Sequence, residues 1–162
     1  MFARPLIDST DFASNGKELR GEVPVEALSR LNDILASSRG TLTYVVRGLR
    51  EGDRYMLEVA LSGVCHLRCQ RCLGELVYPL DMTSRLQLVP ADQLDEIGAD
   101  DDDVDCIQAS SQMDVLALIE DELLLGLPFA PKHPEGACSQ SSEGLEQSAN
   151  PFSVLAGLKK KH

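Results

Sequence analysis

The sequence contains two segments in which apolar residues recur at helical spacing. The first segment is residues 21–40, in which the apolar stripe begins directly after Pro24 and ends before Gly40. Its apolar positions are Val25, Leu28, Leu31 and Leu35. Spacings of three or four residues put such side chains on one face of a helix, and proline is favoured in the first helical turn. The pattern therefore predicts an amphipathic helix of about three turns.

The second segment, residues 110–128, has the same spacing and a defined end. Pro128 terminates the pattern, and Ser111 stands three residues before Asp114, which is a variant of the capping box that begins many helices. The apolar stripe contains Leu116, Ile119, Leu123 and Leu127. The acids expected on the solvated side are Glu120, Asp121 and Glu122. We expect this segment to form the main helix of the core.

Between these segments the period of the apolar positions changes to two, which is typical of strands. Residues 41–63 contain two β-branched and aromatic runs around residues 51–53, so they predict a hairpin in which Gly52 supplies a positive φ. Further strands are predicted at residues 64–69, 75–90 and 104–108. The predicted fold class is α+β: a mainly antiparallel sheet, two or three helices, and a cysteine knuckle between consecutive strands.

Composition favours one compact domain. The chain has 162 residues, of which 43% are hydrophobic and 25% are charged, which is enough for one sizeable core. We expect a single domain over residues 1–138 that includes an acidic loop at 92–105, then a polar linker at 139–149 and a tail at 150–162. No stretch approaches the roughly 18 apolar residues of a spanning helix, and the N-terminus has no export signal. The expected location is cytoplasmic, with no membrane partner.

The negative charge is concentrated in one block. The formal net charge is −11, but residues 92–105 hold eight acids and no Lys or Arg, which leaves −3 on the rest of the chain. Like charges repel and extend such a segment, so a mobile loop is expected. A strongly acidic protein repels nucleic acid. The acidic residues, however, are concentrated in one block, and residues 39–90 hold seven arginines. The sequence therefore still allows a basic face elsewhere on the domain.

Three cysteines have the spacing of a metal site. Cys69 and Cys72 form a C-x-x-C pair, and Cys138 follows a proline-rich turn far downstream. Zinc requires four tetrahedral ligands, and a C-x-x-C turn supplies two of them. We rank His133 first as the fourth ligand because it lies five residues before Cys138. The weaker candidates are Cys65, Cys106, His66 and a water molecule; alternation along the strand makes Cys65 more plausible as a small buried hydrophobe.

Two other interpretations of the thiols stay open. Five cysteines without an export signal indicate reduced thiols, so all of them could be unmetallated. Redox catalysis is less favoured, because a thioredoxin-type pair begins a helix whereas strands flank this one. Nucleotide-binding loops, metalloprotease motifs and nucleophile elbows are missing from the sequence. We therefore expect a protein that is not an enzyme and has no small-molecule substrate.

Three separated motifs resemble one known family. The motifs "CQRCL", "DVLALIEDELLLGLPFAPKH" with a cysteine shortly after, and "NPFSVLAGLK" occur in the order and spacing of the YceD family, the large ribosomal RNA subunit accumulation proteins. The resemblance runs from the segment at Pro24 to Lys159. It implies a small cytoplasmic protein needed for accumulation of large-subunit ribosomal RNA, and it implies no catalytic activity. The matching positions are Cys69, Gln70, Arg71, Cys72, Leu73, Cys138, Asn150, Pro151 and Phe152.

If the chain has that role, its arginines and its C-terminal residues are candidate binding residues. Arg68 and Arg71 are candidate contacts to ribosomal RNA or to a ribosomal or assembly protein, although solvated arginines on a turn are common. The tail with Asn150, Pro151 and Phe152 is too short and apolar to be stable alone, so it either packs back on the domain or docks in a partner's groove. The alternative functions are a thiol-based redox or stress-responsive factor and an interaction module with inert thiols.

Overall fold

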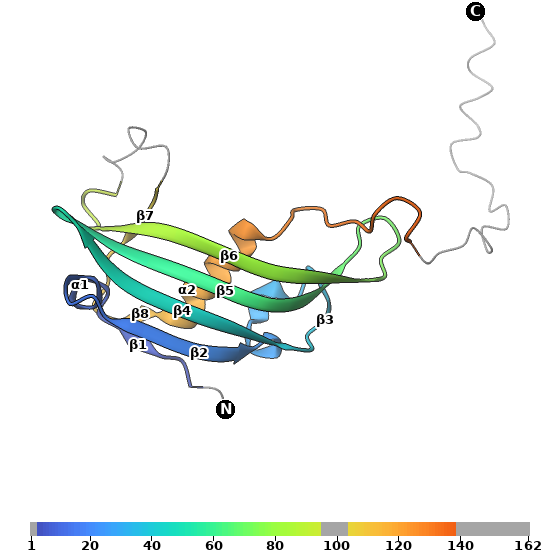
Figure 1. Ribbon diagram of the computed structural model, residues 1–162, viewed down its shortest axis with the longest axis horizontal. Coiled ribbons are helices and arrows are strands. Elements are labelled where there is room, and N and C mark those ends of the chain that lie inside the picture. The colour runs from blue at the N-terminus through green and yellow to red at the C-terminus, as the bar shows by residue number, and fades with distance from the viewer. Residues whose placement is uncertain (1–2, 95–103, 139–162) are drawn as a thin grey trace, which may run out of the picture.

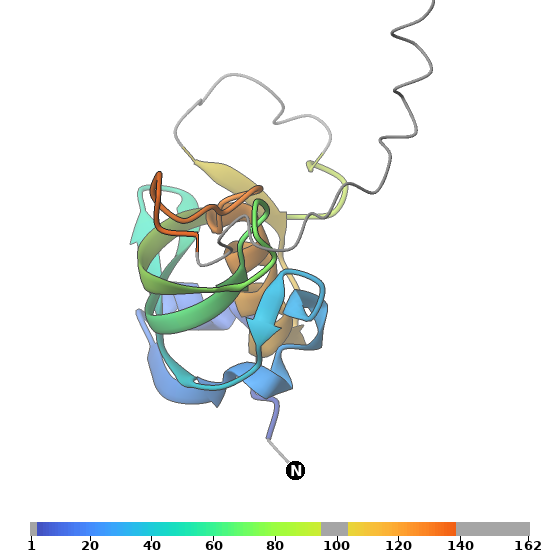
Figure 2. The same cartoon turned by 90° about the vertical axis from the view of Figure 1, so that its right-hand side faces the viewer.

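The computed structural model describes residues 3–94 and 104–138. A long curved sheet forms one layer, and a single long helix lies against its inner face (Figures 1 and 2). The elements in chain order are β1 (Leu6–Ile7), α1 (Ser9–Ser14), β2 (Glu18–Pro24), two 3₁₀ turns (Val25–Ala27 and Ser29–Leu31), β3 (Leu35–Ser37), β4 (Thr41–Glu51), β5 (Arg54–Arg68), β6 (Glu75–Val89), β7 (Asp105–Gln108), β8 (Met113–Asp114) and α2 (Val115–Gly126). The α+β class is confirmed.

The main sheet has the strand order β2-β4-β5-β6-β7, and β3 pairs with the far end of β5. All of its pairs are antiparallel except β6 with β7, which is parallel. The predicted hairpin is confirmed: Glu51 pairs with Arg54, and Gly52 between them has φ 61°. A second, two-stranded sheet joins β1 to β8.

The alternation along β4, β5 and β6 divides the sheet into two faces. The inner face carries the apolar side chains that pack against α2 to form the core, whose largest fully buried members include Leu57, Leu61, Leu86, Leu116, Ile119 and Leu123. The outer face is mostly polar, with Val64 and Val77 as exposed apolar exceptions. There Arg47 bonds both Glu18 on β2 and Glu58 on β5, at 2.5 and 3.3 Å. One buried and one solvated face is the usual arrangement of an antiparallel sheet.

The helix predicted over residues 21–40 was wrong. Its first residues belong to β2, where Pro24 pairs with Thr41, and only two single 3₁₀ turns and β3 follow. Leu28 has φ −96° and ψ 74°, which interrupts the turns. The four residues of the apolar stripe are nevertheless all buried. The pattern identified the core positions but not the backbone, because pairing of β2 with β4 and of β3 with β5 overrode the helical spacing.

The core helix is confirmed, with two corrections. Asp114 is the N-cap in place of Ser111, and its side chain accepts from the backbone N–H groups of Leu116 and Ala117. Glu120 and Glu122 are buried, 4% and 5% exposed, and not on a solvated face. They are buried because the 3₁₀ turns and the sheet cover α2 from two sides: the backbone N–H of Arg30 donates to Glu120 at 3.2 Å, and Ser84 of β6 hydrogen-bonds Glu122.

The N-terminal elements were not anticipated. Asp8 caps α1 through the backbone N–H of Asp11, and α1 packs on β4 where Gly48 leaves room for it. A Cβ at Gly48 would lie 2.2 Å from the carbonyl oxygen of Phe12, so a side chain there would displace α1. Among the described residues, no helix is long and apolar enough to cross a membrane.

Candidate metal centre

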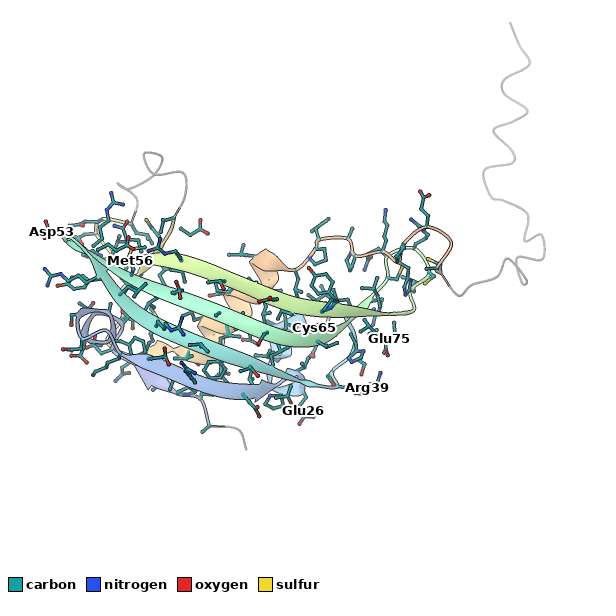
Figure 3. The ribbon with its side chains drawn as sticks, in the orientation of Figure 1. Glu26, Arg39, Asp53, Met56, Cys65 and Glu75 are labelled. Carbon is teal, nitrogen blue, oxygen red and sulfur yellow. The ribbon has the colours of Figure 1, made fainter. Side chains whose placement is uncertain are left out.

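The C-x-x-C pair lies in the turn between β5 and β6, at one end of the sheet. This turn is closed by the backbone N–H of Cys69, which donates to the Gly74 carbonyl at 2.9 Å, and by that of Leu73, which donates to the Cys69 carbonyl at 2.8 Å. Leu73 has φ 61°, a conformation that residues other than glycine rarely adopt. Figure 3 shows Arg39 and Glu75 at this knuckle end of the sheet, with Asp53 at the opposite end.

The loop after α2 returns to the same end of the sheet (Figure 1). The backbone N–H of Gln70 donates to the carbonyl of Pro131 at 2.8 Å, which joins this loop to the knuckle. His133 and Cys138 are carried on the loop, so residues more than sixty positions apart in sequence face one another. The sequence predicted that the loop with Cys138 closes on this pair, with His133 ranked first as the fourth ligand.

Four side chains converge in this place: Cys69, Cys72, His133 and Cys138. Their ligand atoms all lie within 4.8 Å of one another. The sulfurs of Cys69 and Cys138 are 3.9 Å apart, and the Nδ1 atom of His133 is 3.5 Å from the Cys72 sulfur and 3.7 Å from the Cys138 sulfur. Tetrahedral zinc with Zn–S bonds of about 2.3 Å requires sulfurs about 3.8 Å apart. The cluster therefore has the dimensions to hold one metal ion.

A second contact sets which nitrogen of His133 faces the thiols. Its Nε2 atom lies 2.9 Å from the backbone carbonyl oxygen of Glu75, which can only accept, so Nε2 donates. In the neutral imidazole, Nδ1 then keeps its lone pair and faces the sulfurs of Cys72 and Cys138. Histidines that bind metals usually donate their other N–H to a carbonyl or carboxylate in this way.

The environment of Cys69 favours its thiolate. Burial opposes ionisation, but the backbone N–H groups of Cys72, His133 and Arg71 point toward its sulfur and lower the pKa of Cys69 to about 5. The Arg71 N–H lies 3.4 Å from the sulfur. Burial and the neighbouring thiols raise the pKa of Cys138. A deprotonated sulfur is the form that binds a metal ion.

The weaker ligand candidates lie elsewhere. Cys65 is fully buried on the inner face of β5, where burial raises the pKa of its thiol, so its expected role as a small core residue agrees with the structure. Cys106 is on β7, at the other end of β6. His66 points to the outer face, where its Nδ1 lies 2.8 Å from the Glu75 carboxylate that also binds Arg39. None of these three belongs to the described cluster.

Arg68 directly precedes the C-x-x-C motif, Arg71 lies within it, and both are exposed. Arg68 reaches the carbonyl oxygen of Leu35 at 3.4 Å, and exposed Lys132 lies on the loop that covers the knuckle. The other proposed partner contacts, Asn150, Pro151 and Phe152, lie outside the described residues, as does most of the acidic block.

Comparison with known proteins agrees with the motifs. The family "Large ribosomal RNA subunit accumulation protein YceD" matches residues 57–159, more than half of the chain and all four residues of the cluster. This chain belongs to the YceD family. A "Large ribosomal RNA subunit accumulation protein YceD" from Haemophilus influenzae is 31% identical over 105 residues, or 59% of this chain and 60% of that relative. The chain thus matches about three fifths of the relative's length. No solved structure matches it.

Proposed function

We propose that this YceD protein supports accumulation of large-subunit ribosomal RNA without catalysing a reaction, through contacts with ribosomal RNA or a ribosomal assembly protein. The family match over residues 57–159 is the observation that carries this proposal. The name of the Haemophilus influenzae relative states the same process. The knuckle suits a binding role, because three exposed cations surround it: Arg68, Arg71 and Lys132. A metal ion in the cysteine cluster would hold the segments that carry these cations in place.

The metal in our proposal is zinc. Three thiols and one imidazole form the Cys₃His set of structural zinc sites, and soft thiolates disfavour magnesium and calcium. The hydrogen bond of His133 to the Glu75 carbonyl supports the assignment, because it leaves Nδ1 free to coordinate. With all four positions taken by protein atoms, the ion would have no open position for a substrate, as in closed structural sites.

Native mass spectrometry of the full chain under reducing conditions tests the metal assignment. We expect one zinc per chain, lost in Cys72→Ser and kept in Cys106→Ser, the control that removes a half-buried thiol outside the cluster. Zinc retained by Cys72→Ser would rule out Cys72 as a ligand. A metal-free chain that loses two hydrogens on mild oxidation would support the redox interpretation instead.

Contact with phosphate is tested by binding to large-subunit ribosomal RNA at several salt concentrations. Each phosphate contact contributes about 0.7–0.9 to the slope of log affinity against log salt, so Arg68→Ala with Arg71→Ala should lower the slope by about 1.5. Arg20→Ala is the matched control, because Arg20 is an exposed arginine on the edge strand β2, outside the knuckle. An affinity that does not change with salt contradicts RNA contact by these arginines.

The cellular role is tested by depletion and complementation. Loss of the protein should lower the ratio of large- to small-subunit ribosomal RNA, and the wild-type chain should restore it. Arg20→Ala should also restore it, whereas Cys72→Ser should restore less. A ratio that stays unchanged on depletion contradicts the proposed function whether or not the chain binds zinc.

A further inference from the structure

A groove lies between α2 and β7, at the opposite end of β6 from the cysteine cluster. Its volume is about 430 Å³, which is the size of a pocket for several side chains. Its apolar lining includes Leu86, Ile107, Leu118, Leu124 and Leu125, beside Cys106. Leu125 is 76% exposed and Leu124 is 37% exposed, although both belong to the main core helix. Apolar side chains gathered along an open groove are typical of a docking site.

The rim of the groove is acidic. Asp105 at the start of β7 and Asp121 of α2 line it with exposed carboxylates, together with the buried Glu122 and one cation, Arg30, which already pairs with Asp121. A neighbouring hollow of about 410 Å³ shares Ile107, Leu118 and Asp121, so the depression continues along α2. An occupant should therefore be an apolar segment that carries positive charge at one end.

We propose that the occupant is this chain's own C-terminal segment, residues 150–161. Its sequence, "NPFSVLAGLKKK", has an apolar part followed by three lysines. The apolar side chains that would enter the groove are Phe152, Val154, Leu155 and Leu158. Lys159, Lys160 and Lys161 would then meet the acidic rim. This order of apolar and basic residues complements the lining of the groove.

The connecting segment is long enough. The described chain ends at Cys138, close to His133 and, through it, to Glu75 at the first residue of β6. The last residue of α2, Gly126, packs against Met82 of the same strand. Seven strand residues separate Glu75 from Met82, which is about 23 Å at 3.3 Å per residue. The eleven residues 139–149 can span about 36 Å, so residue 150 reaches the near end of the groove.

The direction of approach also fits the charges. A segment coming from the cysteine cluster meets Leu124 and Leu125 at the end of α2 first. Further along β6, Leu86 pairs with Asp105, and Asp121 lies one helical turn before Leu125. The lysines at the end of the segment would thus arrive where the carboxylates are. Because the segment is tethered, its effective concentration is in the millimolar range, which favours it over a free competitor.

Photo-crosslinking of the full chain tests this docking. Phe152 is replaced by benzoylphenylalanine, which keeps an aromatic side chain, and crosslinked peptides are identified by mass spectrometry after irradiation. We expect crosslinks within one chain to peptides of α2 and β7, at a yield that dilution does not change. Crosslinks between chains that disappear on dilution would overturn the proposal in favour of a second copy. Intramolecular crosslinks confined to other elements, or none, would also overturn it.

Two variants of the crosslinking chain locate the site. Leu125→Asp places a charge in the groove at a side chain outside the core, and should lower the yield about tenfold, as expected for an apolar anchor. The matched control is Val77→Asp, at a 61% exposed residue on the outer face of β6, which should leave the yield unchanged. An equal yield in both variants would overturn the assignment to this groove. The readout needs neither RNA nor metal, so it is independent of the proposed function.

Discussion

His133 is bound to the backbone of Glu75: the imidazole Nε2 donates to the carbonyl oxygen of the first residue of β6 over 2.9 Å. This one hydrogen bond connects the loop after α2 to the strand that follows the C-x-x-C turn. It also selects the tautomer of the neutral imidazole, in which Nδ1 carries the lone pair and faces the sulfurs of Cys72 and Cys138. One hydrogen bond therefore sets both the position and the neutral tautomer of the proposed fourth ligand.

Substitution of this histidine tests its role as a ligand. His133→Ala should weaken zinc binding by at least the 10- to 100-fold that is roughly typical for loss of an outer hydrogen-bond partner, because a direct ligand is lost. Competition with a chromophoric chelator measures the affinity. The control is His66→Ala, which removes an imidazole that also contacts Glu75 but lies outside the cluster. Equal affinities in the two variants would exclude His133 from the site.

Metal removal should have a local effect that hydrogen exchange can map. Structural zinc sites bind with apparent free energies of about 10–16 kcal/mol, so chelation should free the loop from the knuckle. We expect faster exchange at the amides of Gln70 and Arg71, which bond the Pro131 carbonyl and the Cys69 sulfur. The amides of Ile119 and Leu123 in the core helix should stay protected.

The outcome distinguishes two kinds of site. Exchange that increases throughout α2 would mean that the metal holds the whole domain together. Exchange that does not change at Gln70 and Arg71 would contradict a metal between the loop and the knuckle. Cys72→Ser without chelator should reproduce the pattern of the chelated wild type.

The buried carboxyl group of Glu122 should make the free energy of unfolding depend on pH. Burial, with further contributions from the charges of Asp105 and Asp121, raises the pKa of Glu122, although a hydrogen bond from Ser84 acts in the opposite direction. A carboxyl group whose pKa is raised in the folded state favours its neutral form there. The free energy of unfolding therefore falls as the pH rises from the ordinary pKa of glutamate through the raised pKa of the folded state. Glu122→Gln removes this cost and should raise the denaturation midpoint at pH 7.

The gain should disappear in acid. Below about pH 4, the ordinary range of glutamate, the wild-type carboxyl is neutral in both states and the two proteins should converge. Urea unfolding at several pH values measures this difference. Glu135→Gln, which changes an exposed carboxylate in the loop after α2, should show no such gain at pH 7. A Glu122→Gln chain that is less stable than wild type at pH 7 would show that the ionised group makes favourable contacts.

The sequence predicted most of the sheet and the site because their signals are local. The Gly52 hairpin, the strands on each side of the C-x-x-C pair and the strand at 105–108 all follow from alternation and turn residues. The metal candidates were recognisable by residue type and spacing, and the structure brings all four together. The parallel pairing of β7 with β6 had no local signal, because it depends on a connection through the acidic block.

The failures of prediction have a different origin. Residues 25–35 have helical spacing, yet they fold as 3₁₀ turns because the two ends of the segment pair with β4 and β5. Glu120 and Glu122 look like surface acids on a helical wheel, but tertiary contacts with the Arg30 backbone and with Ser84 bury them. The groove at Leu125 also had no local signal. Leu125 lies outside the predicted apolar stripe, and the groove forms only because β7 and β6 lie beside α2.

The backbone of Leu73 gives a last prediction, about strain beside the cysteine cluster. Leu73 directly follows Cys72 with φ 61°, which costs a side-chain-bearing residue about 1 kcal/mol, and its side chain is 68% exposed. Leu73→Gly should therefore raise the free energy of unfolding of the metal-bound protein by about 0.5–1 kcal/mol, measured in guanidinium. Leu73→Ala keeps the strain and should give no gain. If Leu73→Gly instead destabilises the protein as much as Leu73→Ala does, contacts of the leucine side chain, and not the backbone conformation, determine the residue at this position.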